Sequence, residues 1–314
     1  MKRRHVFFGI FSLAAACSNV RRPALKSKVS ILKAASYQID LFSRIRGILL
    51  EHQVQVAGKR VVLKPNLVEF SPYLPINTNP IFVAAAAAAF HSLGASSVTI
   101  AEGPGHRRAT LDMAESAGFF EAVPGFENNF VDLNLDDVTR VQLSQPFSNL
   151  ESLYLPHTVL GADLLVSLPK MKTHHWAGAT LSMKNLFGIV PGGVYGWPKN
   201  VLHWAGIDKA IADLHSTFPK QFCLVDGIEA MEGNGPIQGT ALHAGVIIAG
   251  AHPPSVDSTC CQIMGINPQK LKYLELAASR GKVDIWQPDQ IGERIPDVAR
   301  RFALHPDLQN LRLD

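Results

Sequence analysis

Residues 60–66 (RVVLKPN), 162–170 (ADLLVSLPK) and 221–227 (QFCLVDG) share one pattern, a short and nearly continuous apolar run that ends in a polar cluster. Runs of this length without polar alternation are typical of strands that are buried on both faces, as in a parallel sheet. Helical spacing of apolar residues occurs between these runs, for example at 39–52 and 203–218. This order predicts an α/β fold, with a mainly parallel sheet and helices on both faces.

The same patterns on either side of these segments predict more strands and helices. Residues 97–101 and 244–249 predict two further strands, and helices are predicted at 79–93, 110–117, 254–264 and 268–279. Asn79 followed by Pro80 indicates a helix start, because asparagine caps helices and proline fits the first helical position. Patterning is weaker at 119–156, which predicts an irregular or antiparallel insertion there. We expect residues 29–314 to form a single α/β domain.

The first 17 residues predict an export signal. A basic start is followed by an uncharged apolar run from Val6 to Ala16 and then by Cys17. This run is too short to cross a bilayer as a helix, which favours a secretory signal over a membrane span. The alternative is that it forms the first buried strand or helix of the domain.

Two details refine the expected location. The Arg3-Arg4 pair resembles a twin-arginine signal, and Cys17 stands where a bacterial lipoprotein carries its acylated cysteine. Lipidation and simple cleavage both stay open. Residues 18–28 are polar and basic and predict a tether. We therefore expect an exported protein that is periplasmic, or a lipoprotein attached to the membrane through a lipidated Cys17.

The composition excludes several classes of protein. With 47% hydrophobic and 18% charged residues, the chain is neither disordered nor collagenous nor a polytopic membrane protein. The formal net charge is +4, but the signal segment supplies most of it through Lys2, Arg3 and Arg4, so no bulk charge favours nucleic acid as a partner. The four cysteines include no C-x-x-C motif, so we expect no iron–sulfur cluster.

The polar clusters at the strand ends form the candidate functional site. Ligands of an open parallel sheet bind outside the carboxyl ends of its strands, so lysines that follow different strands can meet in one crevice. Several ammonium groups around one cavity repel one another unless an anion, a carboxylate or a lowered lysine pKa relieves them. The sequence therefore predicts a lysine-rich site for a small anionic ligand that bears a phosphate or a carboxylate.

The candidate residues divide into two sets. The catalytic set provides a lysine as electrophile or base, a histidine as proton shuttle and a carboxylate that orients them: Lys170, Lys172, His174 and Asp226. The ligand-binding set follows the first strand or lies in glycine-containing segments with exposed backbone N–H groups: Lys64, Asn66, Lys184, Asn185, Asn234 and Gly235.

Alternatives to an enzyme stay open. The protein can also be a non-enzymatic, membrane-tethered binder of an anion or a metal. A divalent metal has candidate nitrogen and oxygen ligands here, with His174 and Asp226 the most suitable. The sequence leaves the metal and the ligand unidentified. For Asp257 the alternative to a functional role is a structural one, as the cap of the helix predicted at 254–264.

Five segments carry a resemblance to a known family: VVLKPNL (61–67), LPKMKTH (168–174), MKNLFG (183–188), VDGIEAMEGNGP (225–236) and Val256-Asp257. In this order they resemble the bacterial and archaeal family called domain of unknown function 362. The resemblance implies export, since members often have twin-arginine signals. Many members also carry ferredoxin-like cysteine motifs, which this chain lacks. A more distant likeness, to the nickel-pincer lactate racemases, rests on lysines and histidines at strand ends.

If the twin-arginine route is used, replacing Arg3 and Arg4 together by lysine blocks export in the native host, because such a signal is recognised through its arginine pair. Cell fractionation with N-terminal sequencing measures this, and the wild-type protein should lack about its first 16 residues. Unchanged export of the double variant would indicate the general secretory route. A cytoplasmic protein that keeps Met1 would contradict the signal itself.

Overall fold

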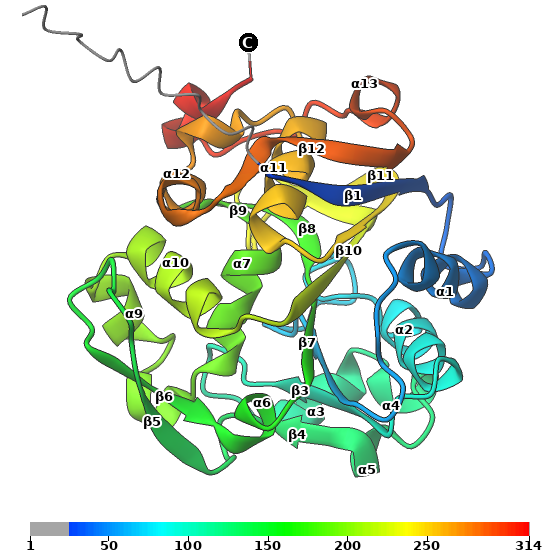
Figure 1. Cartoon of the computed structure of the whole chain (residues 1–314), viewed down its shortest axis with the longest axis vertical. Helices are drawn as coiled ribbons and strands as arrows, with labels where there is room; N and C mark the ends of the chain where they lie inside the picture. Colours follow the sequence, from blue (N-terminus) through cyan, green and yellow to red (C-terminus); the bar gives the residue numbers. More distant parts are fainter. Residues whose placement is uncertain (1–24, 314) are drawn as a thin grey trace, which may run out of the picture.

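Ten strands of the described chain form one sheet, whose parallel half carries the predicted pattern. The computed structural model describes residues 25–313, so the predicted signal, Cys17 and residues 18–24 lie outside it. Strand β2 (Arg60–Pro65) pairs in parallel with β3 (Ser97–Glu102) and β7 (Leu164–Leu168). The next parallel neighbours are β4 (Phe130–Asp132), beside β3, and β10 (Gln221–Glu232), beside β7. The predicted α/β fold is confirmed (Figure 1).

The other half of the sheet is antiparallel at two of its strand pairs. Strand β11 (Thr240–Gly250) runs antiparallel to β10 and to β1 (Leu25–Lys33), and β12 (Val283–Gly292) closes the edge parallel to β1. Residues 25–28, expected to end a tether, instead begin β1. Their backbone pairs with β12, and Lys26 lies 3.8 Å from Asp289 across that pair.

Helices cover both faces of the sheet, as predicted. On one face lie α1 (Leu41–Glu51), α2 (Pro80–Ser92) and α3 (Thr110–Ser116), packed on Val61 and Leu63 of β2. On the other face lie α7 (Ser182–Asn185), α10 (Ile207–Thr217), α11 (Pro253–Ile263) and α12 (Lys272–Arg280). Adjacent strand residues point to opposite faces, so the unbroken apolar run of β2 supplies both cores.

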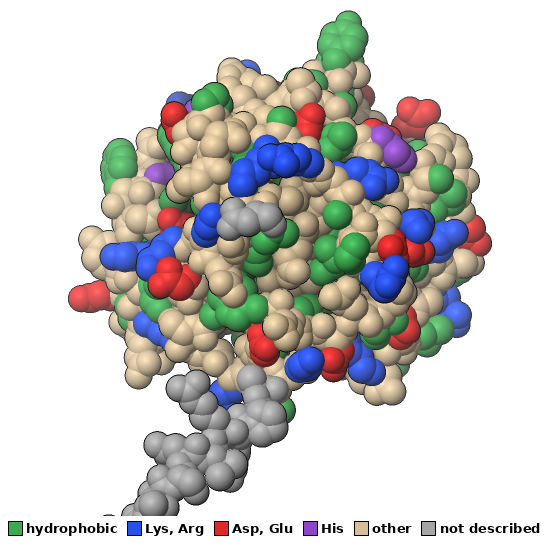
Figure 2. Space-filling model, turned by 90° about the horizontal axis from the view of Figure 1, so that it is seen from above, with side chains coloured by type: hydrophobic (Ala, Val, Ile, Leu, Met, Phe, Trp, Pro, Cys, Tyr) green, Lys and Arg blue, Asp and Glu red, His purple; other side chains and the backbone are tan. Residues whose placement is uncertain are grey.

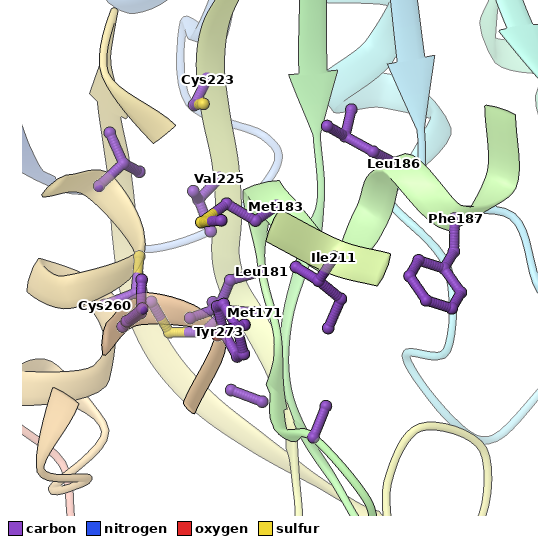
Figure 3. Packing of buried hydrophobic residues seen from close by; sticks show 14 of the residues in the cluster. Met171, Leu181, Met183, Leu186, Phe187, Ile211, Cys223, Val225, Cys260 and Tyr273 are labelled. Carbon is purple, nitrogen blue, oxygen red and sulfur yellow. The ribbon is translucent and has the colours of Figure 1, made fainter. Parts of the chain in front are cut away.

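Figure 3 shows part of the second core, in which Met183 of α7 lies beside Val225 of β10. Cys260 of α11, Ile211 of α10 and Tyr273 of α12 belong to the same apolar cluster. This packing holds the short helix α7 against the sheet. The described cysteines, Cys223, Cys260 and Cys261, are buried free thiols.

The weakly patterned region between β3 and β7 is an insertion, as expected. It contains α4 (Phe119–Ala122), α5 (Phe126–Asn129) and an antiparallel pair, β5 (Val138–Gln142) with β6 (Ser152–Pro156), that forms its own sheet. The predicted start of α2 is also present, since the Asn79 side chain accepts a hydrogen bond of 2.9 Å from the backbone N–H of Ile81.

The remaining elements complete the chain. Strand β8 (Lys170–His174) pairs in parallel with β10 beyond the end of β7, and β9 (Gly178–Thr180) pairs antiparallel with β8. The short helices are α6 (His157–Leu160), η1 (Leu186–Ile189), α8 (Gly192–Tyr195), α9 (Asn200–Trp204), η2 (Pro268–Lys270), α13 (Ile295–Val298) and η3 (Pro306–Leu311). Among residues 25–313, none of the helices has the length and apolarity that a membrane span requires.

Candidate functional site

A cavity of about 540 Å³ opens at the carboxyl ends of β2, β3 and β8. These strands, the loop after β10 and the segment from α7 to α9 all contribute to its wall. The cavity brings together most of the residues predicted from the strand ends: Lys64, Asn66, Lys172, His174, Lys184, Asn185 and Asn234. Lys170, Asp226 and Gly235 are not among the lining residues. The segments that meet here lie far apart in the chain, as expected for strand ends that share one edge of a sheet.

A buried ion pair between Lys64 and Glu102 forms part of the cavity floor. The Lys64 ammonium contacts the Glu102 carboxylate and donates to the Asn185 side-chain oxygen at 3.2 Å, and both members of the pair are fully buried. The same carboxylate accepts hydrogen bonds from the backbone N–H groups of Leu67 (3.1 Å) and Gly103 (3.0 Å). Burial lowers the pKa of Lys64 and raises that of Glu102, whereas their mutual attraction opposes both shifts.

Glu102 is a site residue that the sequence reasoning missed. It ends the apolar strand at 97–101 and precedes a Gly-Pro-Gly turn, so it satisfies the same strand-end rule that selected Lys64. Applying the rule to carboxylates at every predicted strand would have found it.

Lys172 is buried in the cavity wall without a carboxylate partner in the described chain. Its ammonium donates to the backbone carbonyl of Ile76 at 2.7 Å, and its side chain has no accessible surface. Burial holds the pKa of Lys172 well below its usual value, and the nearby Lys170 and Lys184 lower it further. The lowered pKa makes this amine more readily available as a base than an exposed lysine, and in its protonated form it can pair with a ligand's negative charge.

Lys184 and Lys199 provide two more amines of this kind. The Lys184 ammonium lies 3.8 Å from the centre of the Phe187 ring, and burial together with Lys64 lowers its pKa to about 7. Lys199 donates to Asn134 Oδ1 at 2.9 Å, and burial lowers its pKa to about 7 as well. Sequence reasoning missed Lys199 because it lies in a loop that follows no strand, with a backbone φ of 69°.

His174 is held in one tautomer by the backbone that follows it. Its Nδ1 accepts hydrogen bonds from the N–H groups of Trp176 (3.1 Å) and Ala177 (3.2 Å), so the proton of the neutral ring lies on Nε2. Burial, followed by the charge of Lys184, keeps the pKa of His174 well below its usual value. The ring is thus a neutral hydrogen-bond donor in the cavity wall, suited to donating to an anion.

Lys170 and Asp226, predicted as catalytic, form a second buried ion pair outside the cavity lining. The Lys170 ammonium lies 2.6 Å from Asp226 and donates to the Tyr37 hydroxyl at 2.9 Å. Asp226 also accepts from Tyr37 (2.8 Å) and from the backbone N–H of Asn79 (2.9 Å) at the start of α2. Through these contacts the Lys170 ammonium and the Asp226 carboxylate hold β8, β10 and α2 together. The geometry therefore indicates a structural role for both residues.

Gly235, which does not line the cavity, has a packing role. A Cβ at this position would overlap the backbone carbonyl of Thr173, so glycine permits the close approach of the two segments. The Gly235 carbonyl accepts from the backbone N–H of His175 at 3.0 Å and lies 2.8 Å from its Nδ1. The loop therefore supports β8 and leaves Asn234 at the cavity.

Asp257 caps α7 and not α11, the helix in which it lies. It lies buried within α11 and accepts hydrogen bonds from the backbone N–H groups of Ser182 (2.7 Å) and Met183 (2.9 Å). Burial raises the pKa of Asp257 to about 7. Since Lys184 and Asn185 follow directly in α7, this cap sets their position at the cavity.

Two buried polar atoms at the cavity have no hydrogen-bond partner among the described residues. They are Asn66 Oδ1 and Thr180 Oγ1, and both residues line the cavity. Buried polar groups are almost always paired, so orphaned ones at a cavity indicate that a ligand or solvent completes them. Within residues 25–313, no three His, Cys, Asp or Glu side chains come together as a metal site would need.

The fold and the cavity define an α/β protein with a lysine-rich site at its strand ends. The chain belongs to the family described as domain of unknown function (DUF362), whose model matches residues 61–262. It is 27% identical to a thylakoid-associated protein of Synechocystis sp. in an alignment of 255 residues that covers 76% of this chain and 75% of that protein.

A solved structure of the lactate racemase apoprotein from Thermoanaerobacterium thermosaccharolyticum is also similar. Its TM-score is 0.49 at 15% sequence identity, over 77% of this chain and 58% of the racemase chain. The present chain thus spans less than two thirds of the racemase.

Gly188 is expected to be essential for the Lys64–Glu102 pair, because a Cβ there would overlap both charged groups. Gly188→Ala should lower the free energy of unfolding by about 1–3 kcal/mol, as overpacking does in a buried site. Urea denaturation of the purified chain measures this.

Gly193→Ala is the matched control, since nothing lies within 4 Å of the position that the new methyl group would occupy in α8. This variant should be neutral or slightly stabilising. Equal stability of the two variants would contradict the packing described for the ion pair.

Proposed function

We propose that this chain is an exported protein whose strand-end cavity binds a small anionic ligand bearing a phosphate or a carboxylate. The observation that carries the proposal is the charge imbalance of the cavity wall. Lys172, Lys184 and Lys199 all line the cavity, and in the described chain none of them has a carboxylate partner.

The imbalance is unfavourable in the absence of a ligand. Glu102 is the acidic residue of the described cavity lining, and its carboxylate is already taken up by Lys64 and two backbone N–H groups. Bringing further ammonium groups into this low-dielectric region costs desolvation energy and adds repulsion, so the amines shift towards their neutral form. A bound anion removes the repulsion and restores their charge.

The remaining lining groups also suit an anion. His174 presents an Nε2–H donor, and the Thr180 hydroxyl is unpartnered among the described residues. Hydrogen bonds from charged donors to phosphate or carboxylate oxygens are short and strong, and several such donors around one cavity define its ligand class.

The same arrangement supports proton transfer. Burial lowers the pKa of Lys172, which favours removal of a proton from a bound acid by this amine, and His174 can donate a proton from Nε2. We therefore propose Lys172 as base and His174 as donor if the ligand is transformed. Lys170 and Asp226, outside the cavity, would act only through the position of β8.

Export is the second part of the proposal, and it is supported by the order of charge, apolar run and small residues before Cys17. The relative from Synechocystis is named for its association with thylakoids, which agrees with a location at a membrane.

Lys172→Met tests the binding function. Methionine keeps an aliphatic chain but removes the charge, so affinity for sulfate should fall about 10- to 100-fold, as expected for the loss of a charge-assisted contact of about 1.5–3 kcal/mol. Isothermal titration calorimetry measures this. The free energy of unfolding should stay unchanged or rise, because repulsion in the cavity is relieved.

Two variants frame this result. Lys282→Met removes an exposed lysine of the same charge and should leave sulfate affinity unchanged. Lys64→Met leaves the buried Glu102 carboxylate without its ion-pair partner, so it should destabilise the chain by about 3–5 kcal/mol. If Lys172→Met destabilises the chain as strongly and leaves binding intact, the lysine is structural and the proposal is wrong.

Sulfate affinity should also fall as the pH rises from 6.5 to 8.5, by about tenfold. Sulfate keeps its charge in this range, so the change reports on the protein. The pKa values of Lys184 and Lys199 are about 7 in the free chain, and an anion raises them. Binding therefore takes up protons above pH 7, which weakens it at higher pH.

Calorimetry in buffers of different ionisation enthalpy measures the proton uptake directly. The double variant Lys184→Met/Lys199→Met should lose most of the pH dependence. Tighter binding at pH 8.5 than at 6.5 would show that these lysines do not carry the anion's charge.

A further inference from the structure

The wall of the cavity changes from charged at the floor to aromatic at the mouth. Lys64 and Lys172 have no accessible surface, and Lys199 is 2% exposed. Trp176 also lines the cavity, yet 61% of its surface is exposed. Lys64, Lys172 and Lys199 are thus deep and Lys184 is half-buried, whereas a large aromatic ring stands at the entrance.

A continuous row of rings runs from the entrance of the cavity to Lys184. The Trp176 ring lies 4.8 Å from that of His175 and 5.4 Å from that of His203, centre to centre. His203 in turn lies 5.5 Å from Phe187, over whose ring the Lys184 ammonium is placed. All of these residues line the cavity, so aromatic surface extends from its entrance to Lys184.

The size and lining of the cavity exceed what an inorganic anion needs. A volume of about 540 Å³ is within the range of pockets that enclose drug-sized molecules. Pro198, Pro236 and Ile237 add apolar surface to the wall. An anion at the lysines would leave this apolar part in contact with water alone.

We propose that the ligand is an acid whose phosphate or carboxylate is attached to a planar aromatic or heteroaromatic ring. This inference rests on the proposed function, because it places the anionic group among Lys172, Lys184 and Lys199. The ring then packs against Trp176 and its neighbours. Aromatic rings favour offset-stacked or edge-to-face contacts at about 4.5–7 Å, and the exposed ring of Trp176 can offer such a contact at the cavity mouth.

Isothermal titration calorimetry on the full chain tests this with three probes of equal charge, namely methyl, cyclohexyl and phenyl phosphate. Phenyl phosphate should bind at least tenfold more tightly than methyl phosphate and several-fold more tightly than cyclohexyl phosphate. Acetate and benzoate provide the carboxylate pair, and a tenfold preference for the aryl member of either pair supports the proposal. Equal affinities within both pairs, or measurable and equal affinities for the phenyl and cyclohexyl phosphates, would overturn it.

A matched pair of variants locates the aromatic contribution. Trp176→Ala should lower the affinity for the preferred aryl probe about tenfold and the affinity for its alkyl counterpart less than twofold. Trp204→Ala removes a tryptophan that is 79% exposed and does not line the cavity, and it should change neither. An equal loss of affinity for both probes in Trp176→Ala would contradict recognition of the ring.

Failure of the proposed function gives a different result. In that case none of the alkyl or aryl acids binds, and Lys172→Met alters nothing. If the alkyl acids bind in a Lys172-dependent way without an aryl preference, the anion site stands and only the ring proposal fails.

Discussion

Burial of the Lys64–Glu102 ion pair is the constraint on which the cavity depends. A buried pair is stable only if hydrogen bonds satisfy its remaining donors and acceptors, and here the backbone of Leu67 and Gly103 and the side chain of Asn185 do so. The pair therefore binds the ends of β2 and β3 to the end of α7. It also explains the glycine at 188, since any larger residue would displace the two charges.

Around this neutral pair the cavity concentrates positive charge, unlike the face of the molecule that Figure 2 shows. Figure 2 shows basic and acidic side chains interspersed over the face above β12 and α13. In the interior, by contrast, Lys172, Lys184 and Lys199 share a small volume without a second carboxylate among the described lining residues. Burial of such groups lowers stability, and proteins retain this kind of strain chiefly where a ligand or a reaction compensates for it.

The segments shared with the family serve two different ends. Lys64, Lys172 and Lys184 reach the cavity, whereas Lys170 and Asp226 join β8 to β10 and to the start of α2. Asp257 caps α7, and the glycine at 235 allows a close approach of backbones. Some residues of these segments thus line the site and others support it, and only their contacts distinguish the two.

The architecture and the location of the site follow from local pattern. Unbroken apolar runs such as 61–63 predict strands buried on both faces, and the polar residues after them mark the edge where the lysines meet. The role of each residue depends on contacts across long separations in the chain, which local pattern does not encode. Lys170 and Lys172 are two positions apart on one strand, yet one faces Asp226 and the other the cavity. Lys199 joins the site from a loop, and Asp257 acts on α7 from another helix. Tertiary packing alone decides which charges are neutralised, and therefore which remain available for a ligand.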